Sequence, residues 1–310
     1  MKTLSLVVPC FNEQESIPIF LQKIKEIYEK MKNDLDLEII FVDDGSKDET
    51  LNIIKSFHQE DNRIKYISFS KNFGKEAAIY AGLEKSIGDF VALMDVDLQD
   101  PPELLLDMYN GIINKGYDCV ATKRTSRKGE PPIRSFFAKC FYKLINKISK
   151  TEIVDGARDY RMMTRQMVDS ILSLKEYNRF SKGIFSWVGY KTKWLEYENI
   201  ERVAGQTKWS FWKLLIYSLE GIMAFSTVPL VIASIVGLIL FFISILMLFI
   251  NLVKTSVFGY YASTYYNIIN VILLIGGLQI LFTGILGQYL SKIYLEIKNR
   301  PIYITREESK

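Results

Sequence analysis

Two aspartates that stand two positions apart are the clearest chemical signal in this sequence. Asp95 and Asp97 follow the short apolar run Phe90–Met94, and Gln99 comes two positions later. Hard oxygen ligands of this kind suit Mg²⁺ or Mn²⁺, which proteins commonly share between one or two carboxylates and substrate phosphates. Taken alone, an Asp-x-Asp pair often only shapes a turn. Its place after an apolar strand favours a metal–diphosphate site, with Asp95, Asp97 and Gln99 as ligands.

Other polar or aromatic side chains follow the remaining apolar runs. Phe11 follows the first run and can stack on a flat base, or it can belong to the core. Asp43 and Asp44 end the second run, where they can contact a ligand or begin a turn. Lys75, on the helix after the third run, can contact a donor phosphate or be an ordinary first-turn lysine. We expect these residues to lie along one edge, because ligands of parallel sheets bind beyond the carboxyl ends of the strands.

The elements that must position these residues alternate along the first 120 residues. The expected strands are Leu4–Pro9, Glu38–Asp43, Ile64–Phe69, Phe90–Met94 and Cys119–Thr122. The expected helices are Glu15–Lys32, Lys47–Gln59, Lys75–Ser86 and Pro102–Lys115. This repeated order predicts an α/β fold with a mostly parallel sheet covered on both faces. Two helix starts show cap patterns, a capping box at Ser46-x-x-Glu49 and Asp100-Pro-Pro-Glu103.

Composition limits the classes of partner. The chain has 310 residues and a net charge of +4, so it is only mildly basic. It contains no basic block with the aromatic spacing of a nucleic-acid surface, and we expect no nucleic-acid partner. Cys10, Cys119 and Cys140 are too far apart for a metal motif or an evident disulfide framework, which favours a reducing compartment.

Two long apolar stretches predict transmembrane helices at residues 225–253 and 267–291. Each exceeds the roughly 20 residues that a helix needs to cross the hydrocarbon core. Basic residues flank the pair, whereas the linker between them holds one lysine, Lys254, and several tyrosines. The positive-inside bias therefore places both chain ends in the cytoplasm, on a multi-pass protein of the cell membrane.

The rest of the chain divides around these spans. Residues 1–206 are expected to form a cytoplasmic catalytic domain, and residues 292–310 a basic cytoplasmic tail. Segments 132–150 and 207–224 mix basic and aromatic residues, which is typical of helices lying in the headgroup layer. The alternative for both segments is packing against the catalytic domain.

Four motifs resemble those of the family 2 glycosyltransferases, which have the GT-A fold: PCFNE (9–13), DDGSKDET (43–50), NFGKEAA (72–78) and DVDLQDPPE (95–103). Later segments narrow the resemblance to polyprenyl-phosphate glycosyltransferases, a group that includes bactoprenol glucosyltransferases and, more distantly, dolichol-phosphate mannose synthases. These segments are VDGARDYRMMTRQMV (154–168), RFSKGIFSWVG (179–189) and RVAGQTKWSFWKL (202–214). The resemblance covers nearly the whole chain.

The resemblance implies inverting transfer of a hexose from a nucleotide sugar to a polyprenyl phosphate such as undecaprenyl phosphate. UDP-glucose is the first choice of donor, while UDP-N-acetylglucosamine, UDP-galactose and GDP-mannose stay open. The implied cofactor is Mg²⁺ or Mn²⁺, and a homo-oligomer is also implied.

The same resemblance implies roles for individual residues. Asp43 would hold the base or ribose of the nucleotide with help from Pro9, Phe11 and Glu13, and we count Asp44, Lys75 and Asp95 in the same donor site. The lipid phosphate would be bound near Arg134, Arg202 and Lys208. Asp159 corresponds to the proposed catalytic base, and Asp97 is counted as catalytic with it.

The charge of the acceptor bears on the role of Asp159. A phosphate monoester has a second pKa of about 6 and is already a nucleophile at neutral pH. A strong general base is then less necessary than for a sugar hydroxyl. We therefore expect Asp159 to position the acceptor or the metal site. Cations should hold the acceptor, and the available ones are Arg124, Arg127, Lys128, Arg134, Arg158, Arg161, Arg202 and Lys208.

Two rival functions are disfavoured. A polymerising synthase would carry a Q-x-x-R-W motif and more spans, and the sequence contains no such motif. A membrane-tethered nucleotide-sugar sensor without turnover would not need the intact Asp95/Asp97 pair and Asp159.

Overall fold

The structure is a computed structural model that describes residues 1–125, 154–198 and 264–309, together with isolated positions between these ranges. The chain divides into two compact units. The first comprises Met1–Ala224 and Arg300–Lys310, and the second comprises Phe225–Asn299. The first unit holds every predicted site residue.

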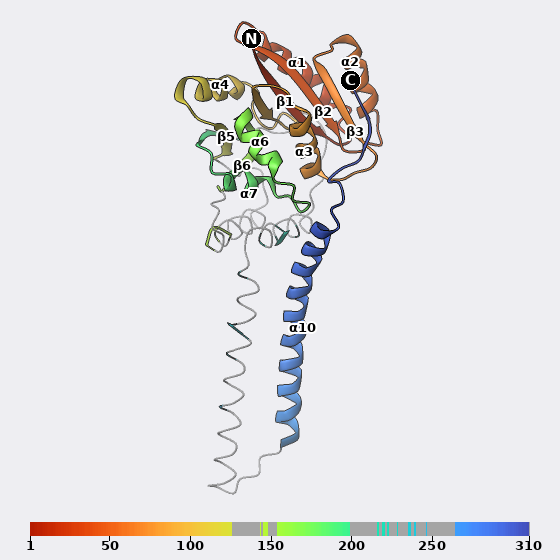
Figure 1. The fold of residues 1–310 in the computed structure, drawn as a ribbon, viewed down its shortest axis with the longest axis vertical. Helices are drawn as coiled ribbons and strands as arrows, with labels where there is room; N and C mark the ends of the chain where they lie inside the picture. The colour runs from red at the N-terminus through yellow and green to blue at the C-terminus, as the bar shows by residue number, and fades with distance from the viewer. Residues whose placement is uncertain are drawn as a thin grey trace. The chain divides into compact units, whose positions relative to one another are not determined.

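The first unit is built on one mixed sheet (Figure 1). In the described residues its strand order is β7-β5-β6-β4-β1-β2-β3-β8. The strands are β1 Lys2–Cys10, β2 Leu35–Asp43, β3 Ile64–Phe69, β4 Phe90–Leu93, β5 Cys119–Arg124, β6 Ala157–Thr164, β7 Thr192–Tyr197 and β8 Thr305–Glu308. The pairs β1–β2, β1–β4, β2–β3 and β5–β7 are parallel, and the pairs β4–β6, β5–β6 and β3–β8 are antiparallel. The predicted α/β fold with a mostly parallel sheet is confirmed.

Helices cover both faces of this sheet. They are α1 Ser16–Tyr28, α2 Thr50–Glu60, α3 Lys75–Lys85, α4 Leu104–Lys115, α6 Arg165–Ser173 and α7 Ser181–Trp187. Successive residues of a strand point to opposite faces, so a strand buried on both sides is apolar throughout. In β2, Phe41 packs in a cluster with residues of α1, α2 and α4, whereas Ile40 and Val42 pack with the alanines of α3. These two layers hold the strand ends in place.

Both predicted helix caps were wrong. Helix α2 begins at Thr50 and α4 at Leu104, and the side chain of neither N-cap residue, Glu49 or Glu103, makes a capping hydrogen bond. The predicted cap residues have other partners. Ser46 Oγ accepts a hydrogen bond from Asn12 N, and Asp100 pairs with Arg158. These polar residues therefore belong to the strand-end loops and not to the helices.

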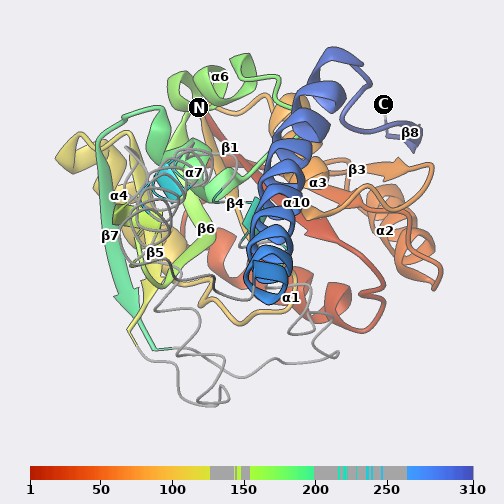
Figure 2. The same ribbon diagram turned by 90° about the horizontal axis from the view of Figure 1, so that it is seen from below.

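The last residues of the chain return to the sheet. We predicted a basic tail at 292–310, but Thr305–Glu308 forms β8, antiparallel to β3 (Figure 2). Just before β8, the ring of Tyr303 stacks on Phe69 with 4.9 Å between ring centroids. Its hydroxyl donates to Glu84 Oε2 at 2.6 Å. The C-terminus thus closes the β3 edge of the sheet.

In the second unit, Thr264–Ile297 forms a single helix, α10, of 34 residues, which includes the range predicted for the second span. Within the described part of the chain, no helix is both long and apolar enough to cross a membrane. The first predicted span, 225–253, and the segments 132–150 and 207–224 lie almost wholly outside the described residues. The spans and the cytoplasmic location stay predictions.

Candidate active site

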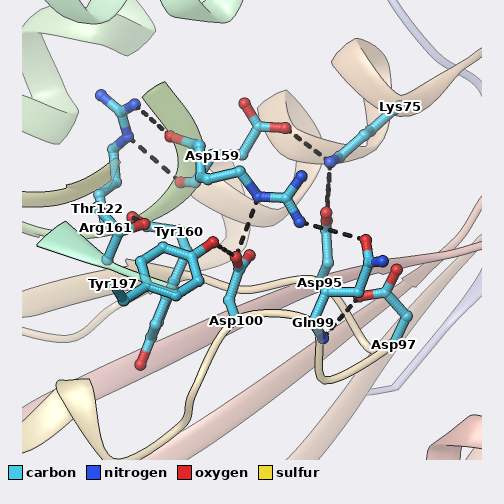
Figure 3. A network of polar contacts seen from close by, with 11 residues as sticks. Lys75, Asp95, Asp97, Gln99, Asp100, Thr122, Asp159, Tyr160, Arg161 and Tyr197 are labelled. Atoms are coloured by element: carbon cyan, nitrogen blue, oxygen red, sulfur yellow. Dashed lines mark hydrogen bonds and ion pairs between the residues drawn. The ribbon is translucent and has the colours of Figure 1, made fainter. Parts of the chain in front are cut away.

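Strand β6 brings Asp159 to Asp95. Strands β4 and β6 are antiparallel, with Leu93 opposite Arg161. Asp95 comes two residues after Leu93, and Asp159 two residues before Arg161, so the same register places the two aspartates across from each other. Both contact Lys75, whose Nζ lies 2.8 Å from the Asp95 carboxylate and 2.6 Å from Asp159 Oδ2 (Figure 3). The predicted metal ligand, base and lysine therefore form one cluster.

Lys75 is held in this place by the start of α3, of which it is the first residue. The Asp44 carboxylate accepts hydrogen bonds from Phe73 N at 2.6 Å and Gly74 N at 3.1 Å. Gly74 has φ of +97°, a backbone conformation that favours glycine. Asp44 is only 4% exposed, and burial raises its pKa to about 6 against the opposing effect of these two N–H donors. Asp44 thus anchors the loop that presents Lys75.

The Lys75–Asp159 pair is held in its ionised form. Burial acts against the charge on Lys75, but attraction to Asp159 and Asp95 outweighs it and raises the pKa of the ammonium. Burial likewise acts against the charge on Asp159, but Lys75, Lys182 and Arg161 outweigh it and hold the pKa of Asp159 well below its usual range. A carboxylate of such low basicity is a weak general base. This charge state supports a positioning role for Asp159.

An ion pair with a buried aspartate, Asp100, fixes the loop that carries the predicted metal ligands. Arg158 Nε donates to Asp100 Oδ1 at 3.0 Å, and the Tyr197 hydroxyl donates to the same oxygen. Arg158 Nη2 also donates to Gln99 Oε1 at 3.4 Å. Gln99 N donates to Asp97 Oδ1 at 3.2 Å (Figure 3). The loop residues 95–100 are in this way tied to β6 and β7.

Sequence reasoning missed this network. Asp100 was assigned to a helix cap and Arg158 to the pool of phosphate-binding cations, while Tyr197 was not considered. The available signal was the short spacing of Arg158 from Asp159, but nothing local indicates a partner 58 residues away.

The second arginine of β6, Arg161, also has its guanidinium engaged by protein partners. Arg161 is 3% exposed, and its guanidinium lies 3.9 Å from the centre of the Phe185 ring. It donates to the carbonyl oxygens of Asp159 and Arg158. Arg161 is therefore a structural residue, and its inclusion among available phosphate ligands was wrong. The predicted lipid-phosphate ligands Arg134, Arg202 and Lys208 lie outside the described residues.

The turns after β1 and β2 meet at the same edge. Asn12 N donates to Ser46 Oγ at 2.8 Å, and Lys47 N donates to Asn12 Oδ1 at 2.9 Å. Asp43, 1% exposed, accepts from Ser46 N at 3.0 Å and from Ser68 Oγ at 2.8 Å. In this structure the Asp43 carboxylate therefore shapes the turn. Its predicted contact with a nucleotide stays a prediction.

Three more predicted donor residues lie along this edge and are partly buried. Pro9 is in β1, and Phe11 and Glu13 follow it. Glu13 N donates to Thr50 Oγ1 at 2.8 Å, and Ser16 Oγ donates to Glu13 Oε2 at 2.9 Å. These bonds connect the turn after β1 to the first residues of α1 and α2.

The side chains at this edge can be compared with the ligands that a divalent metal ion requires. Among the described residues, no group of three or more acidic, histidine or cysteine side chains is placed to hold an ion. An ion shared with substrate phosphates needs only one or two protein carboxylates. Asp95 and Asp97 meet that need, whereas the Gln99 oxygen is engaged by Arg158. The residues fit a shared Mg²⁺ or Mn²⁺ site with two carboxylate ligands.

Comparisons with known proteins show which family this chain resembles. Residues 5–172 match the family model Glycosyl transferase family 2. The SfII prophage-derived bactoprenol glucosyl transferase of Shigella flexneri is 43% identical over 304 residues, which cover 98% of this chain and 97% of that protein. The prophage bactoprenol glucosyl transferase homolog of Escherichia coli (strain K12) is 41% identical over 307 residues, 99% of each chain. Among solved structures, mannosyl-3-phosphoglycerate synthase from Rubrobacter xylanophilus is similar over 72% of each chain, with 18% identity and a TM-score of 0.48.

Proposed function

Because the chain belongs to glycosyl transferase family 2 and is a glycosyltransferase, we propose that it moves a hexose from a nucleotide sugar to a polyprenyl phosphate. The proposed donor is UDP-glucose and the proposed acceptor is undecaprenyl phosphate. UDP-N-acetylglucosamine, UDP-galactose and GDP-mannose are the alternative donors. The same proposal places the enzyme in the cell membrane as a homo-oligomer, with the catalytic domain in the cytoplasm.

One observation carries the choice of acceptor. The family model ends at residue 172, but the likeness to the bactoprenol glucosyl transferase of Shigella flexneri covers 98% of this chain. It therefore includes the region after the donor-binding half, where an acceptor-specific part of the protein belongs. The name of that relative supports a lipid carrier as the acceptor.

The described residues support a simple division of labour. Departure of the nucleoside diphosphate creates negative charge. In the proposal, the ammonium of Lys75, the first residue of α3, stabilises this charge. A Mg²⁺ or Mn²⁺ ion held by Asp95 and Asp97 would add Lewis-acid stabilisation of the same charge. Asp159 stays ionised beside Lys75. It orients the lysine through their contact of 2.6 Å.

The acceptor supplies its own nucleophile. A polyprenyl phosphate is largely dianionic at neutral pH, since its second pKa is about 6. Attack of a phosphate oxygen on the anomeric carbon, opposite to the leaving diphosphate, forms the new C–O bond and inverts the configuration. No proton has to be removed from this nucleophile. In the proposal, Arg134, Arg202 and Lys208 hold the phosphate, because fork-like cations suit an anionic headgroup.

The test is a product assay with the purified full chain in detergent. The enzyme, undecaprenyl phosphate and Mg²⁺ or Mn²⁺ are incubated with each of the four nucleotide sugars, and the glycolipid is identified by mass. A hexosyl-phosphate lipid from UDP-glucose is the expected product. A product from another donor would correct the sugar, and no product from any donor would refute the proposal.

A matched pair of variants ties the product to this site. Asp97→Asn removes a carboxylate charge from the predicted metal site and should lower the rate at least 100-fold, as the loss of a major electrostatic contribution does. Asp107→Asn makes the same change on the exposed surface of α4 and should leave the rate unchanged. Equal rates for the two variants would show that the product does not arise at the Asp95/Asp97 site.

A further inference from the structure

We propose that Lys75 is a built-in counter-ion that holds Asp95 and Asp159 together before a divalent ion binds, and that it competes with that ion for Asp95. The inference rests on the metal site of the proposed function. It does not depend on the identity of the sugar or the lipid. It gives Lys75 a role in the donor-free enzyme, which is distinct from a contact with donor phosphate.

The contacts put the ammonium between the two acids. Lys75 Nζ lies 2.8 Å from the Asp95 carboxylate and 2.6 Å from Asp159 Oδ2, so one cation bridges two elements. Asp95 lies two residues after the end of β4, and Asp159 lies in β6. Two carboxylates that face each other repel unless a cation lies between them. Lys75 supplies that cation.

The Lys75 ammonium occupies the same carboxylate, that of Asp95, that a metal ion would use as a ligand. Asp95 is a predicted metal ligand and Asp97 stands two residues away. A divalent ion bound to the Asp95 carboxylate and an ammonium 2.8 Å from the same group would repel each other strongly at such short range. The two cations must therefore compete, or the ammonium must move away from Asp95.

The structure permits that movement without a change in fold. The backbone of Lys75 is fixed, because Asp44 anchors Phe73 and Gly74 at the start of α3. Its ammonium is carried on a flexible four-carbon chain. The side chains of Lys75, Asp95 and Asp159 are 34%, 27% and 20% exposed, so an ion can reach them from solvent. Asp159 remains as the partner of Lys75 when Asp95 is taken by the ion.

The experiment measures Mn²⁺ binding to the purified full chain in detergent, without donor or lipid, from the free-ion signal in electron paramagnetic resonance. Lys75→Met removes the competing charge and should bind Mn²⁺ at least tenfold more tightly than the wild type. Lys75→Arg keeps the charge and should stay within about threefold of it. Lys71→Met is the matched control, because Lys71 lies over the Phe73 ring in the same loop, and it should bind as the wild type does.

Each other outcome counts against the proposal. Unchanged Mn²⁺ binding by Lys75→Met would mean that the lysine does not compete with the ion, and weaker binding would mean that it supports the ion. Adding Asp97→Asn to Lys75→Met should abolish the tighter binding, and its persistence would place the ion elsewhere. No saturable binding by any variant would also overturn the inference. Should Lys75→Met fail to fold, judged by thermal unfolding, Lys75→Gln takes its place with the same expectation.

The two proposals fail in distinguishable ways. If the binding assay shows the expected competition and the donor panel gives no glycolipid, the counter-ion role stands and the proposed reaction is wrong. If glycolipid forms and Lys75→Met does not bind Mn²⁺ more tightly, the reaction stands and the counter-ion role is wrong.

Discussion

Replacing Arg158 by methionine tests the ion pair that fixes the loop of predicted metal ligands. The change removes the guanidinium and leaves the Asp100 side chain, 2% exposed, without its charged partner. Breaking a buried pair in this way typically costs about 3–5 kcal/mol. The Tyr197 hydroxyl still donates to Asp100, so we expect a loss near the lower end, about 3 kcal/mol.

The assay is thermal unfolding of the purified full chain, followed by intrinsic fluorescence. At about 2–4 °C per kcal/mol for a domain of this size, the melting temperature should fall by about 6–12 °C. The matched control is Arg63→Met, which removes the same group from Asp61 in a pair whose side chains are 50% and 20% exposed. A pair so exposed to water contributes less than about 1 kcal/mol, and the control should lose no more than about 4 °C.

A double-mutant cycle then separates the pair from each residue alone. Asp100→Asn removes the charge that Arg158 neutralises, so the double variant should be more stable than the sum of the two single losses predicts, by about 2 kcal/mol. Additive losses, or a loss for Arg158→Met no larger than that of Arg63→Met, would refute the claim that this pair stabilises the loop.

Three further predictions concern single side chains. Asp44→Asn keeps an acceptor for Phe73 N and Gly74 N without the buried charge. Because burial raises the folded-state pKa of Asp44 to about 6, the wild type becomes less stable as pH rises from about 4 to 6. The melting temperature of the variant relative to that of the wild type should therefore be higher at pH 8 than at pH 5. A relative melting temperature that is lower at pH 8 than at pH 5 would show that the charge of Asp44 stabilises the fold. Asp159→Asn should lower kcat equally from pH 6 to pH 9, because the low pKa of Asp159 keeps it ionised over that range; recovery at high pH would instead show a general base. Tyr303→Ala should lower the free energy of unfolding by about 2 kcal/mol through loss of the stack on Phe69. Tyr303→Phe, which removes only the hydroxyl, should lower it by under about 1 kcal/mol. Equal losses for the two variants in chemical denaturation would show that the hydroxyl supplies the stabilisation.

Much of the fold could be predicted because its signals are local. The expected strands at Ile64–Phe69 and Cys119–Thr122 correspond to β3 and to most of β5, and the helix expected to begin at Lys75 does begin there. A short, continuous apolar run indicates a strand of a parallel sheet that is buried on both faces, whichever strands it pairs with. Local patterns failed at Ser46 and Asp100, where a cap was expected, because each side chain has a partner distant in the sequence: Asn12 in the turn after β1 for Ser46, and Arg158 in β6 for Asp100.

The sequence by itself determined the chemistry available at the strand ends. It placed Asp43, Asp95 and Asp97 at the ends of buried strands, since residue type and hydrophobic period are readable one segment at a time. Only the tertiary structure decided which of these groups meet. Lys75 contacts Asp159 across 84 positions, and Tyr66 N donates to Ser309 Oγ, just after β8, across 243. Both contacts depend on antiparallel strand pairings, β4 with β6 and β3 with β8, that no local pattern encodes. The physical reason is that strand order and register follow from the packing of the whole sheet, so the Lys75 bridge between two acids exists only once β6 lies beside β4.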